Sequence, residues 1–351
     1  MTVSAAVERR ETPMAVPARR PVWSFVRSSG LRSVVVGASK DPNAKVTILL
    51  VSPESGKPVL AVKAPTTDTA GIAVETEGSV LAALHERVPD ELAAAIPRPV
   101  ETLDYDGRPA VVATAVSGTP MTTSYVRRRH RRSSTRVAAD FEAVGRWLAS
   151  LRRATAAEAT PLEMDGGVTE RLRERFAGVA GLDRAVDRLE EILAALRAET
   201  VARTAVHGDF WFGNILLADG RVTGVVDWES GTTNGEPARD LARFAHMYAL
   251  YLGGATAPRH RVRGHAGIRP GAWGAAVEYA LDGTGWFPEL FRRFLGDGLA
   301  AIGSSPNAWR RVALAGIAEV AALTDHDDFA RRHLELFHRC AHLERGRKEG
   351  S

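Results

Sequence analysis

The sequence predicts an α+β chain of two lobes, a sheet-rich N-terminal lobe followed by a helical C-terminal lobe. Up to residue 116, short β-branched runs alternate with turn residues, whereas beyond it apolar residues recur at helical spacing. A length of 351 residues is sufficient for two lobes, each with its own core. We therefore divide the chain into a tail over residues 1–20, an N-terminal lobe over 21–116 and a helical C-terminal lobe over 117–351.

The tail and the overall composition indicate a cytoplasmic protein. Residues 1–20 carry Arg, Glu and Pro without an apolar segment, which is typical of a disordered tail and not of a secretory signal. No apolar run approaches the roughly 20 residues that cross a bilayer, and Cys340 is the only cysteine. We expect no membrane partner, and a monomer or homodimer. A net charge of +4 attracts anions such as nucleotide phosphates only mildly.

The N-terminal lobe is predicted to contain a five-stranded antiparallel sheet and one helix. Residues 23–65 have a β pattern, with strands expected at 34–36, 44–51 and 59–63, separated by turns rich in Pro, Gly, Asn and Ser. A second hairpin, over 100–105 and 109–116, completes the sheet. A helix over 74–84 precedes this hairpin.

Apolar stripes dominate the C-terminal lobe. Further helices are expected over 238–251, 273–281, 287–295 and 309–343, with a polar connection over 158–167 and an exposed loop over 253–269. The two clearest stripes are Phe141, Val144, Trp147, Leu148 and Leu151, then Leu182, Val186, Leu189, Leu193 and Leu196. We interpret them as core and not as sites.

One stretch carries the chemistry of the chain. Residues 207–216 read H-G-D-F-W-F-G-N-I-L, and residues 224–229 read G-V-V-D-W-E. The first keeps the spacing of a kinase catalytic loop, H-R-D-x-x-x-x-N. Phosphoryl transfer requires an aligned nucleophile and a divalent metal that neutralises the phosphate oxygens. Asp209, Asn214 and Asp227 would supply these functions.

This stretch resembles the aminoglycoside phosphotransferase and choline kinase family, whose loop reads H-G-D-[LFW]-x-x-x-N before a D-W-E or D-F-E strand end. The matching positions are His207, Gly208, Asp209, Asn214, 227–229, Gly235 and 240–242. Trp211 and Phe212 replace a frequent His-Pro, and Trp211 also resembles the fructosamine kinase branch. Over residues 34–250, the resemblance implies a two-lobed protein-kinase-like fold and transfer of phosphate from ATP or GTP to a small-molecule hydroxyl.

The resemblance also implies a role for each polar residue of the stretch. Asp209 would orient the acceptor hydroxyl and take its proton late, because a carboxylate is too weak a base to deprotonate an alcohol beforehand. Asn214 and Asp227 would hold Mg²⁺ through oxygen atoms. His207 would bond the backbone around Asp227, and Asp240 would bond the backbone of the catalytic loop.

A lysine in the N-terminal lobe is the candidate phosphate ligand. Lys63 ends a run that is similar to the V-A-I-K strand of kinases, in which Lys pairs with the α- and β-phosphates. A solvated strand end is the alternative. An acidic residue of the following helix would anchor this lysine. Helical phase leaves Glu75 and Glu77 open, and the family pattern selects Glu77.

Two further nucleotide contacts are expected in this lobe. The turn over 37–43 lies where kinases cover the phosphates, so Ser39 is a candidate phosphate ligand. It lacks G-x-G-x-x-G, and a plain hairpin turn is the alternative. The resemblance places adenine against the hinge, at Ala113, Ala115 and Val116.

The acceptor site is expected in the helical lobe after Asp240. Polycationic aminoglycosides would require carboxylates there, and residues 324–328, T-D-H-D-D, are the best local candidate unless they cap a helix. The acidic residues available are Asp282, Asp297, Glu319, Asp325, Asp327 and Asp328. A nucleoside or macrolide antibiotic suits the mild basicity of the chain better. The expected acceptor is an antibiotic or related metabolite, with a role in antibiotic resistance.

Three alternatives remain open. The first is a kinase for fructosamine, a sugar or a choline-like metabolite. The second is a nucleotide-binding pseudokinase scaffold, which the intact Lys63, Asp209, Asn214 and Asp227 disfavour. The third uses the basic run 127–132 to bind RNA, although the absence of interleaved aromatic residues disfavours nucleic acid. Switching by activation-loop phosphorylation is not expected, because Gly replaces the Arg of H-R-D.

Overall fold

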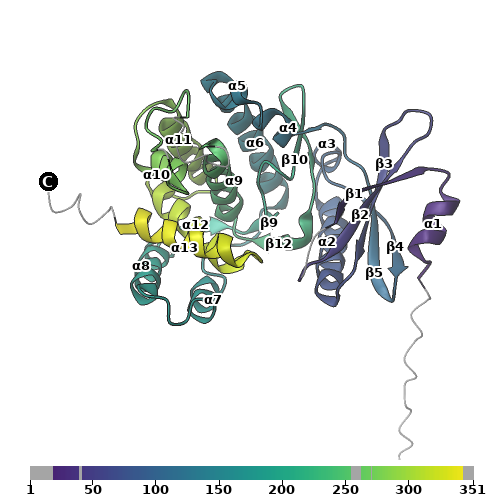
Figure 1. Ribbon diagram of the computed structural model, residues 1–351, viewed down its shortest axis with the longest axis horizontal. Coiled ribbons are helices and arrows are strands. Elements are labelled where there is room, and N and C mark those ends of the chain that lie inside the picture. The colour runs from purple at the N-terminus through teal and green to yellow at the C-terminus, as the bar shows by residue number, and fades with distance from the viewer. Residues whose placement is uncertain (1–18, 39–41, 254–261, 270, 343–351) are drawn as a thin grey trace, which may run out of the picture.

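The computed structural model describes residues 19–38, 42–253, 262–269 and 271–342. Figure 1 shows two lobes side by side, one built on strands β1 to β5 with helix α2, the other on helices. The α+β architecture predicted from sequence is thus confirmed. Of the expected tail over residues 1–20, only residues 19 and 20 fall within the described residues.

The sheet of the N-terminal lobe has five strands in the order β1-β2-β3-β5-β4, and each neighbouring pair is antiparallel. This confirms the predicted meander and hairpin. In the register, Thr47 lies opposite Lys63. The strands are β1 Arg32–Ala38, β2 Lys45–Val51, β3 Pro58–Pro65, β4 Pro99–Tyr105 and β5 Arg108–Thr114.

The first residues of this lobe were wrongly predicted as part of a β pattern. They form helix α1, Val22–Ser28, which follows Pro21. Val22, Phe25 and Val26 recur at helical spacing and bury one face in the small core of this lobe. Apolar contact with the sheet therefore outweighs the β propensity of the valines.

Helix α2, Asp68–Arg87, includes the helix predicted over 74–84 and is longer by a turn or more at its start. The side chain of Thr67 caps it by accepting a hydrogen bond from the Ala70 amide. Val74, Leu81 and Leu84 are buried, and Glu77 is buried on the same helix. A short helix, α3 Asp90–Ala93, follows.

Small sheets, β11-β10-β6 with β12-β9 and β7-β8, follow the N-terminal lobe, and the first two flank the catalytic stretch. The predicted last strand stops at Thr114, two residues before the expected Val116, because the chain then turns to β6, Thr119–Pro120, which pairs with β10. The strands of this region are β8 Thr200–Ala202, β9 Thr204–Val206, β10 Ile215–Ala218, β11 Arg221–Val225 and β12 Thr232–Gly235. The loop between β9 and β10 holds Asp209, and Asp227 follows β11.

The C-terminal lobe is mainly helical, and both predicted core stripes are buried. Its helices are α4 Met121–Tyr125, α5 Arg128–Arg131, α6 Ser134–Thr155, α7 Val168–Arg175, α8 Leu182–Leu196, α9 Ala238–Leu250, α10 Ala275–Asp282, α11 Trp286–Ala300, α12 Trp309–Leu323 and α13 Asp327–His342, with short 3₁₀ turns η1 Trp228–Ser230, η2 Tyr251–Gly253 and η3 Pro306–Ala308. Among the described residues, no helix is long and apolar enough to cross a membrane.

Three predictions for this lobe were wrong. The loop expected to be exposed over 253–269 buries His265 and Ile268 within its described part, and His265 contacts the Arg131 carbonyl (2.7 Å). The helix expected over 309–343 is two helices, because Thr324 is extended (ψ 141°) and the chain folds back so that α12 and α13 pack together. Asp327 and Asp328 lie in the first turn of α13, and Arg175 bonds the Thr324 carbonyl and pairs with Asp327. The connection expected over 158–167 contains strand β7, Ala159–Pro161, which pairs with β8.

Candidate active site

The catalytic loop is fixed by an aspartate at the start of α9. Asp240 accepts hydrogen bonds from the amides of His207 (2.8 Å) and Gly208 (3.0 Å), as expected. Burial raises the pKa of Asp240, against the opposing effect of His207 and these amides. Gly208 has φ 79°, and a Cβ there would lie 2.2 Å from the Ser230 carbonyl oxygen. Only glycine fits this position.

His207 ties the loop to the strand end that bears Asp227. Its Nε2 lies 2.9 Å from the carbonyl oxygen of Val226, and its Nδ1 lies 3.2 Å from the amide nitrogen of Asp209. Since a carbonyl only accepts and an amide only donates, Nε2 carries the proton. Both ring nitrogens are thus used to hold backbone, which is the structural position expected of His207.

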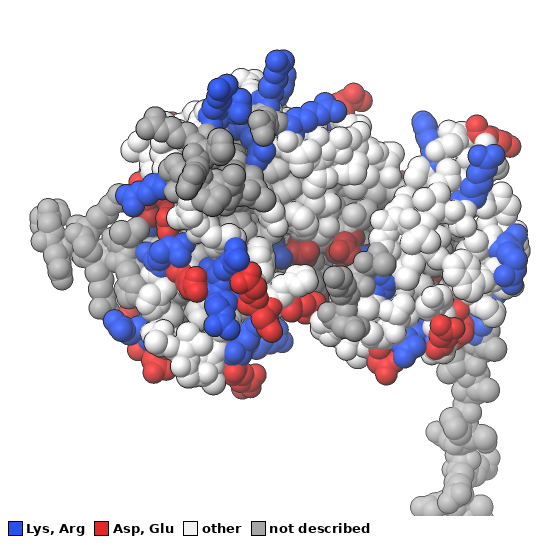
Figure 2. Space-filling view, viewed as in Figure 1, with Lys and Arg blue, Asp and Glu red and all other residues white. Residues whose placement is uncertain are grey.

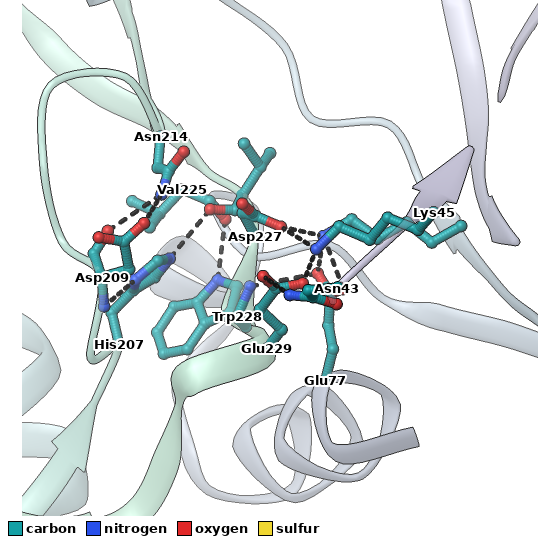
Figure 3. A network of polar contacts seen from close by, with 12 residues as sticks. Asn43, Lys45, Glu77, His207, Asp209, Asn214, Val225, Asp227, Trp228 and Glu229 are labelled. Carbon is teal, nitrogen blue, oxygen red and sulfur yellow. Dashed lines mark hydrogen bonds and ion pairs between the residues drawn. The ribbon is translucent and has the colours of Figure 1, made fainter. Parts of the chain in front are cut away.

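Asp209 and Asn214 contact each other directly. The side-chain amide of Asn214 donates to the carbonyl (3.0 Å) and to Oδ2 (3.2 Å) of Asp209. Within the described residues, Asn214 Oδ1 accepts no hydrogen bond. Val226 donates from its amide to the carbonyl of Asn214 (3.0 Å), which places Asn214 beside Asp227. Figure 3 shows Asp209 and Asn214 at one end of a polar network, with Asp227 between them and Lys45.

Lys63 joins the two lobes. Its Nζ lies 2.6 Å from Glu77 Oε2 and 2.5 Å from Asp227 Oδ1, and Glu77 also accepts from the Trp228 amide. Glu75, the other candidate, is exposed and pairs with Arg19. Burial opposes the charge of Lys63, but Glu77 and Asp227 outweigh it and raise its pKa.

Asp227 is held in an unusual backbone conformation. Its φ of 72° lies in the left-handed region, which is costly for a residue other than glycine. Burial favours its neutral form, yet Lys63 and Lys45 more than offset this and lower its pKa to about 2. The carboxylate is therefore charged at neutral pH.

Sequence reasoning missed a second lysine. Lys45 forms an ion pair with Glu229 and lies 3.7 Å from Asp227, while Asn43 donates to Glu229 (2.9 Å). Burial lowers the pKa of Lys45. Strand alternation could have found it, because Lys45 is two residues from Thr47, which pairs with Lys63, so both lysines share one face of the sheet.

The oxygen atoms of this network suit a hard cation. Within the described part of the chain, carboxylate oxygens of Glu77, Asp227 and Glu229 lie within 4.8 Å of one another. Asp227, one of the two predicted ligands, belongs to this group, and the side-chain oxygen of Asn214, the other, accepts no hydrogen bond from the described residues. Carboxylate and carbonyl oxygens are the ligands that Mg²⁺ prefers, so these residues fit the predicted ion. Figure 2 shows acidic side chains gathered in the hollow between the lobes.

An arginine from α9 contacts the candidate catalytic carboxylate and was also missed. Arg243 Nε and Nη2 lie 2.9 and 2.5 Å from Asp209 Oδ1. The signal available was its place one turn after Asp240, on the helix that anchors the catalytic loop.

The predicted adenine contacts lie at the end of β5. Ala113 is buried within the sheet and pairs with Ala61 of β3. The Ala115 amide already donates to the Val59 carbonyl (2.9 Å), and the Val116 side chain packs on Gly224 of β11. Contact between these residues and adenine remains a prediction. Ser39 lies outside the described residues.

The basic run 127–132 includes helix α5, and Arg131 of this run bonds to the backbone of the C-terminal lobe. Arg131 donates to the carbonyls of Tyr251 (3.0 Å) and Leu252 (3.3 Å) and lies over the ring of Tyr125. His130 contacts Asp140 (2.7 Å). These contacts account for part of the run without a nucleic acid.

The fold matches several solved phosphotransferases at low sequence identity. A thermostable mutant of the aminoglycoside phosphotransferase APH(4)-Ia is 11% identical, with a TM-score of 0.57 over 92% of this chain and 98% of that chain. ADP-bound aminoglycoside phosphotransferase APH(2'')-Ib is 16% identical (TM-score 0.51, 91% and 96% covered). A macrolide 2'-phosphotransferase type I is 15% identical (TM-score 0.52, 90% and 95% covered).

No curated protein matches the chain in sequence. A family model does, over residues 48–276, well over half of the chain. This region contains the lysine strand, the catalytic loop and helix α9. The predicted resemblance is confirmed, and the chain belongs to the phosphotransferase enzyme family, with the two-lobed kinase-like fold of the aminoglycoside and macrolide phosphotransferases.

Proposed function

We propose that this protein transfers the γ-phosphate of ATP or GTP to a hydroxyl group of a small molecule. The observation that supports this most is the single network of Lys63, Glu77 and Asp227, continuous through Trp228 and Val226 with Asp209 and Asn214. A pseudokinase scaffold would have no need for all of these groups, and none of them is replaced.

In this proposal the lysines bind the phosphates of the donor, and Asn214 and Asp227 bind Mg²⁺. Lys63, kept charged by Glu77, would bind phosphate oxygens of the donor. Asn214 and Asp227 would hold Mg²⁺, which neutralises charge on the phosphate oxygens when it is bound. Lys45 adds a second cation that the phosphates can attract away from Glu229.

Asp209 would act on the acceptor. Its carboxylate is held by Asn214 at Oδ2 and is partly exposed (29% of the side chain), so an alcohol can reach it. It would orient the hydroxyl toward the γ-phosphorus and take the proton as the new P–O bond forms and the bond to the leaving diphosphate breaks.

The acceptor class is open between several hydroxyl compounds. Structural neighbours include a complex with ADP and hygromycin B, and a macrolide phosphotransferase. By analogy we propose an antibiotic or related metabolite as acceptor, with resistance as one role. A sugar or choline-like metabolite kinase is the competing assignment.

A direct assay tests the proposal. Purified protein, Mg²⁺ and γ-labelled ATP or GTP would be incubated with a panel of hydroxylated antibiotics, nucleosides and sugars. We expect Mg²⁺-dependent label in at least one acceptor, lost on chelation and restored by added Mg²⁺. Nucleotide binding without transfer to any acceptor would favour the pseudokinase, and absence of both would refute the assignment.

A further inference from the structure

The ion pair between Arg243 and Asp209 leaves part of the guanidinium available. Nε and Nη2 of Arg243 both contact Asp209 Oδ1, whereas Asn214 contacts Oδ2. A guanidinium has five N–H groups in one plane. Within the described residues Nη1 makes no hydrogen bond, and 22% of the Arg243 side chain is exposed. The group therefore offers free donors to solvent next to Asp209.

An acceptor at Asp209 would meet these donors. Its hydroxyl must lie within hydrogen-bond distance of the carboxylate, and the guanidinium already lies on that carboxylate. A neighbouring oxygen of the acceptor can accept from Nη1, whereas a neighbouring ammonium is repelled and cannot accept.

Most of the carboxylates of the C-terminal lobe considered for aminoglycoside binding already have a cationic partner. Figure 2 shows basic and acidic side chains interspersed on the C-terminal lobe. Four of the six carboxylates considered for aminoglycoside binding are paired with arginines: Asp282 with Arg310, Glu319 with Arg239, Asp327 with Arg175 and Asp328 with Arg332. The side chain of Glu319 is only 11% exposed. At Asp282 and Glu319 an amino sugar would have to displace an arginine, whereas the side chains of Asp327 and Asp328 are 90% and 77% exposed and only weakly paired.

We propose that Arg243 binds the acceptor and determines its class: an alcohol with an oxygen beside the reacting hydroxyl, such as a vicinal diol, in preference to an amino alcohol. This inference rests on the proposed function. It favours nucleoside-like or sugar acceptors over aminoglycosides, because a positive charge next to the reacting hydroxyl would lie against the guanidinium.

Matched acceptors that differ in one group test it. The pairs are trans-cyclohexane-1,2-diol with trans-2-aminocyclohexanol, and inositol with inosamine. Their kcat/KM values would be measured in the full chain with Mg²⁺ and ATP. We expect each diol to be preferred about 10-fold or more, and the ratio to fall to about 2-fold or less in Arg243→Gln. The ratio is the informative readout, since displacement of Asp209 alone would slow both members of a pair equally.

Arg173→Gln is the control. Arg173 of α7 pairs with Glu190, and neither residue is a candidate for the acceptor site, so this variant should keep the diol preference. Preference for the amino alcohols, or an unchanged ratio in Arg243→Gln, would overturn the inference.

A binding measurement separates this inference from the proposed function. Association of the same four alcohols with the complex of the protein, Mg²⁺ and AMP-PNP would be followed by NMR. If no acceptor is phosphorylated, the proposed function fails, while a diol preference in binding that Arg243→Gln abolishes still supports the inference. Absence of binding by all four alcohols, or equal binding of diol and amine, refutes it.

Discussion

Two charged clusters lie in the hollow between the lobes, and they differ in composition. The nucleotide-side cluster consists of Lys45, Lys63, Glu77, Asp227 and Glu229, with two cations facing three carboxylates. It takes side chains from both lobes. The acceptor-side cluster is Asp209 with Arg243, both from the C-terminal lobe.

The difference reflects what each cluster would bind. A nucleotide triphosphate and its cation present the same charges whatever the acceptor, so the nucleotide-side cluster needs a fixed set of lysines and oxygen ligands. The acceptor-side cluster has to suit one substrate. Its arginine is therefore the group least determined by general phosphoryl-transfer chemistry.

The largest effect is expected on the acceptor side. Asp209→Asn removes the proton acceptor but keeps the shape, so kcat should fall by about 10³-fold, whereas nucleotide affinity should change little. Release of ADP and fluorescent-nucleotide titration measure the two quantities. Asp219→Asn is the control, because Asp219 occupies a left-handed turn (φ 50°) that Asn also tolerates. Equal losses of kcat in both variants would contradict the proposed role of Asp209 in the transfer step.

In the nucleotide-side cluster, replacement of Lys63 should lower kcat/KM for the nucleotide more than replacement of Lys45. Lys63→Ala is expected to lower kcat/KM for the nucleotide by about 10²-fold, since Lys63 bridges Glu77 and Asp227. Lys45→Ala should cost about 10-fold, because its main partner is Glu229. Steady-state kinetics with varied ATP measures both, and Lys57→Ala in the exposed β2–β3 turn is the control. A larger loss for Lys45→Ala would reverse the assignment of the phosphate-binding lysine.

Two glutamates of α2 allow a test of stability. Glu77→Gln should lower the free energy of unfolding by about 2 kcal/mol, because it removes a buried carboxylate from the partly buried Lys63. Glu75→Gln should cost about 0.5 kcal/mol or less, since its pair with Arg19 is exposed. Urea unfolding of both variants measures this. Similar losses at the two positions would argue against the interlobe ion pair.

The smallest effect concerns a carboxylate outside both clusters. Burial raises the pKa of Glu236 to about 7. The Glu236 carboxyl group therefore binds its proton more tightly in the folded protein than in the unfolded chain. The free energy of unfolding should therefore fall as pH rises, by about 1 kcal/mol between pH 6 and 8. Glu236→Gln should remove this part of the pH dependence in urea unfolding. If the free energy of unfolding of Glu236→Gln fell with pH as steeply as that of the unmodified protein, another group would be responsible for the pH dependence.

Much of the fold could be predicted because its signals are local. Strands β1 to β5 follow β-branched runs bounded by turn residues, and the core stripe of α8 is a clear helical repeat. The failures have tertiary causes. Helix α1 is stabilised by packing on the sheet, and α12 ends at Thr324 although the helical repeat continues beyond it.

The site was predictable to the extent that its residues share a motif. Asp209 and Asn214 follow the spacing of the catalytic loop and contact each other, and Asp227 after the next strand contacts Lys63. The sequence analysis did not predict Lys45 and Arg243 as site residues, because their partners, Glu229 and Asp209, lie far away in sequence. Periodicity places Lys45 on the sheet face of Lys63 and Arg243 one turn after Asp240, but the partners of these residues depend on how the elements pack.

Because Gly208 lies so close to the Ser230 carbonyl, a larger residue at this position is incompatible with the present backbone, and this limits how the enzyme could evolve. Protein kinases use an arginine at the corresponding place to sense a phosphorylated loop. A point mutation to Arg would introduce a side chain where no Cβ can be accommodated, so this lineage could adopt such control only after the backbone had been rebuilt.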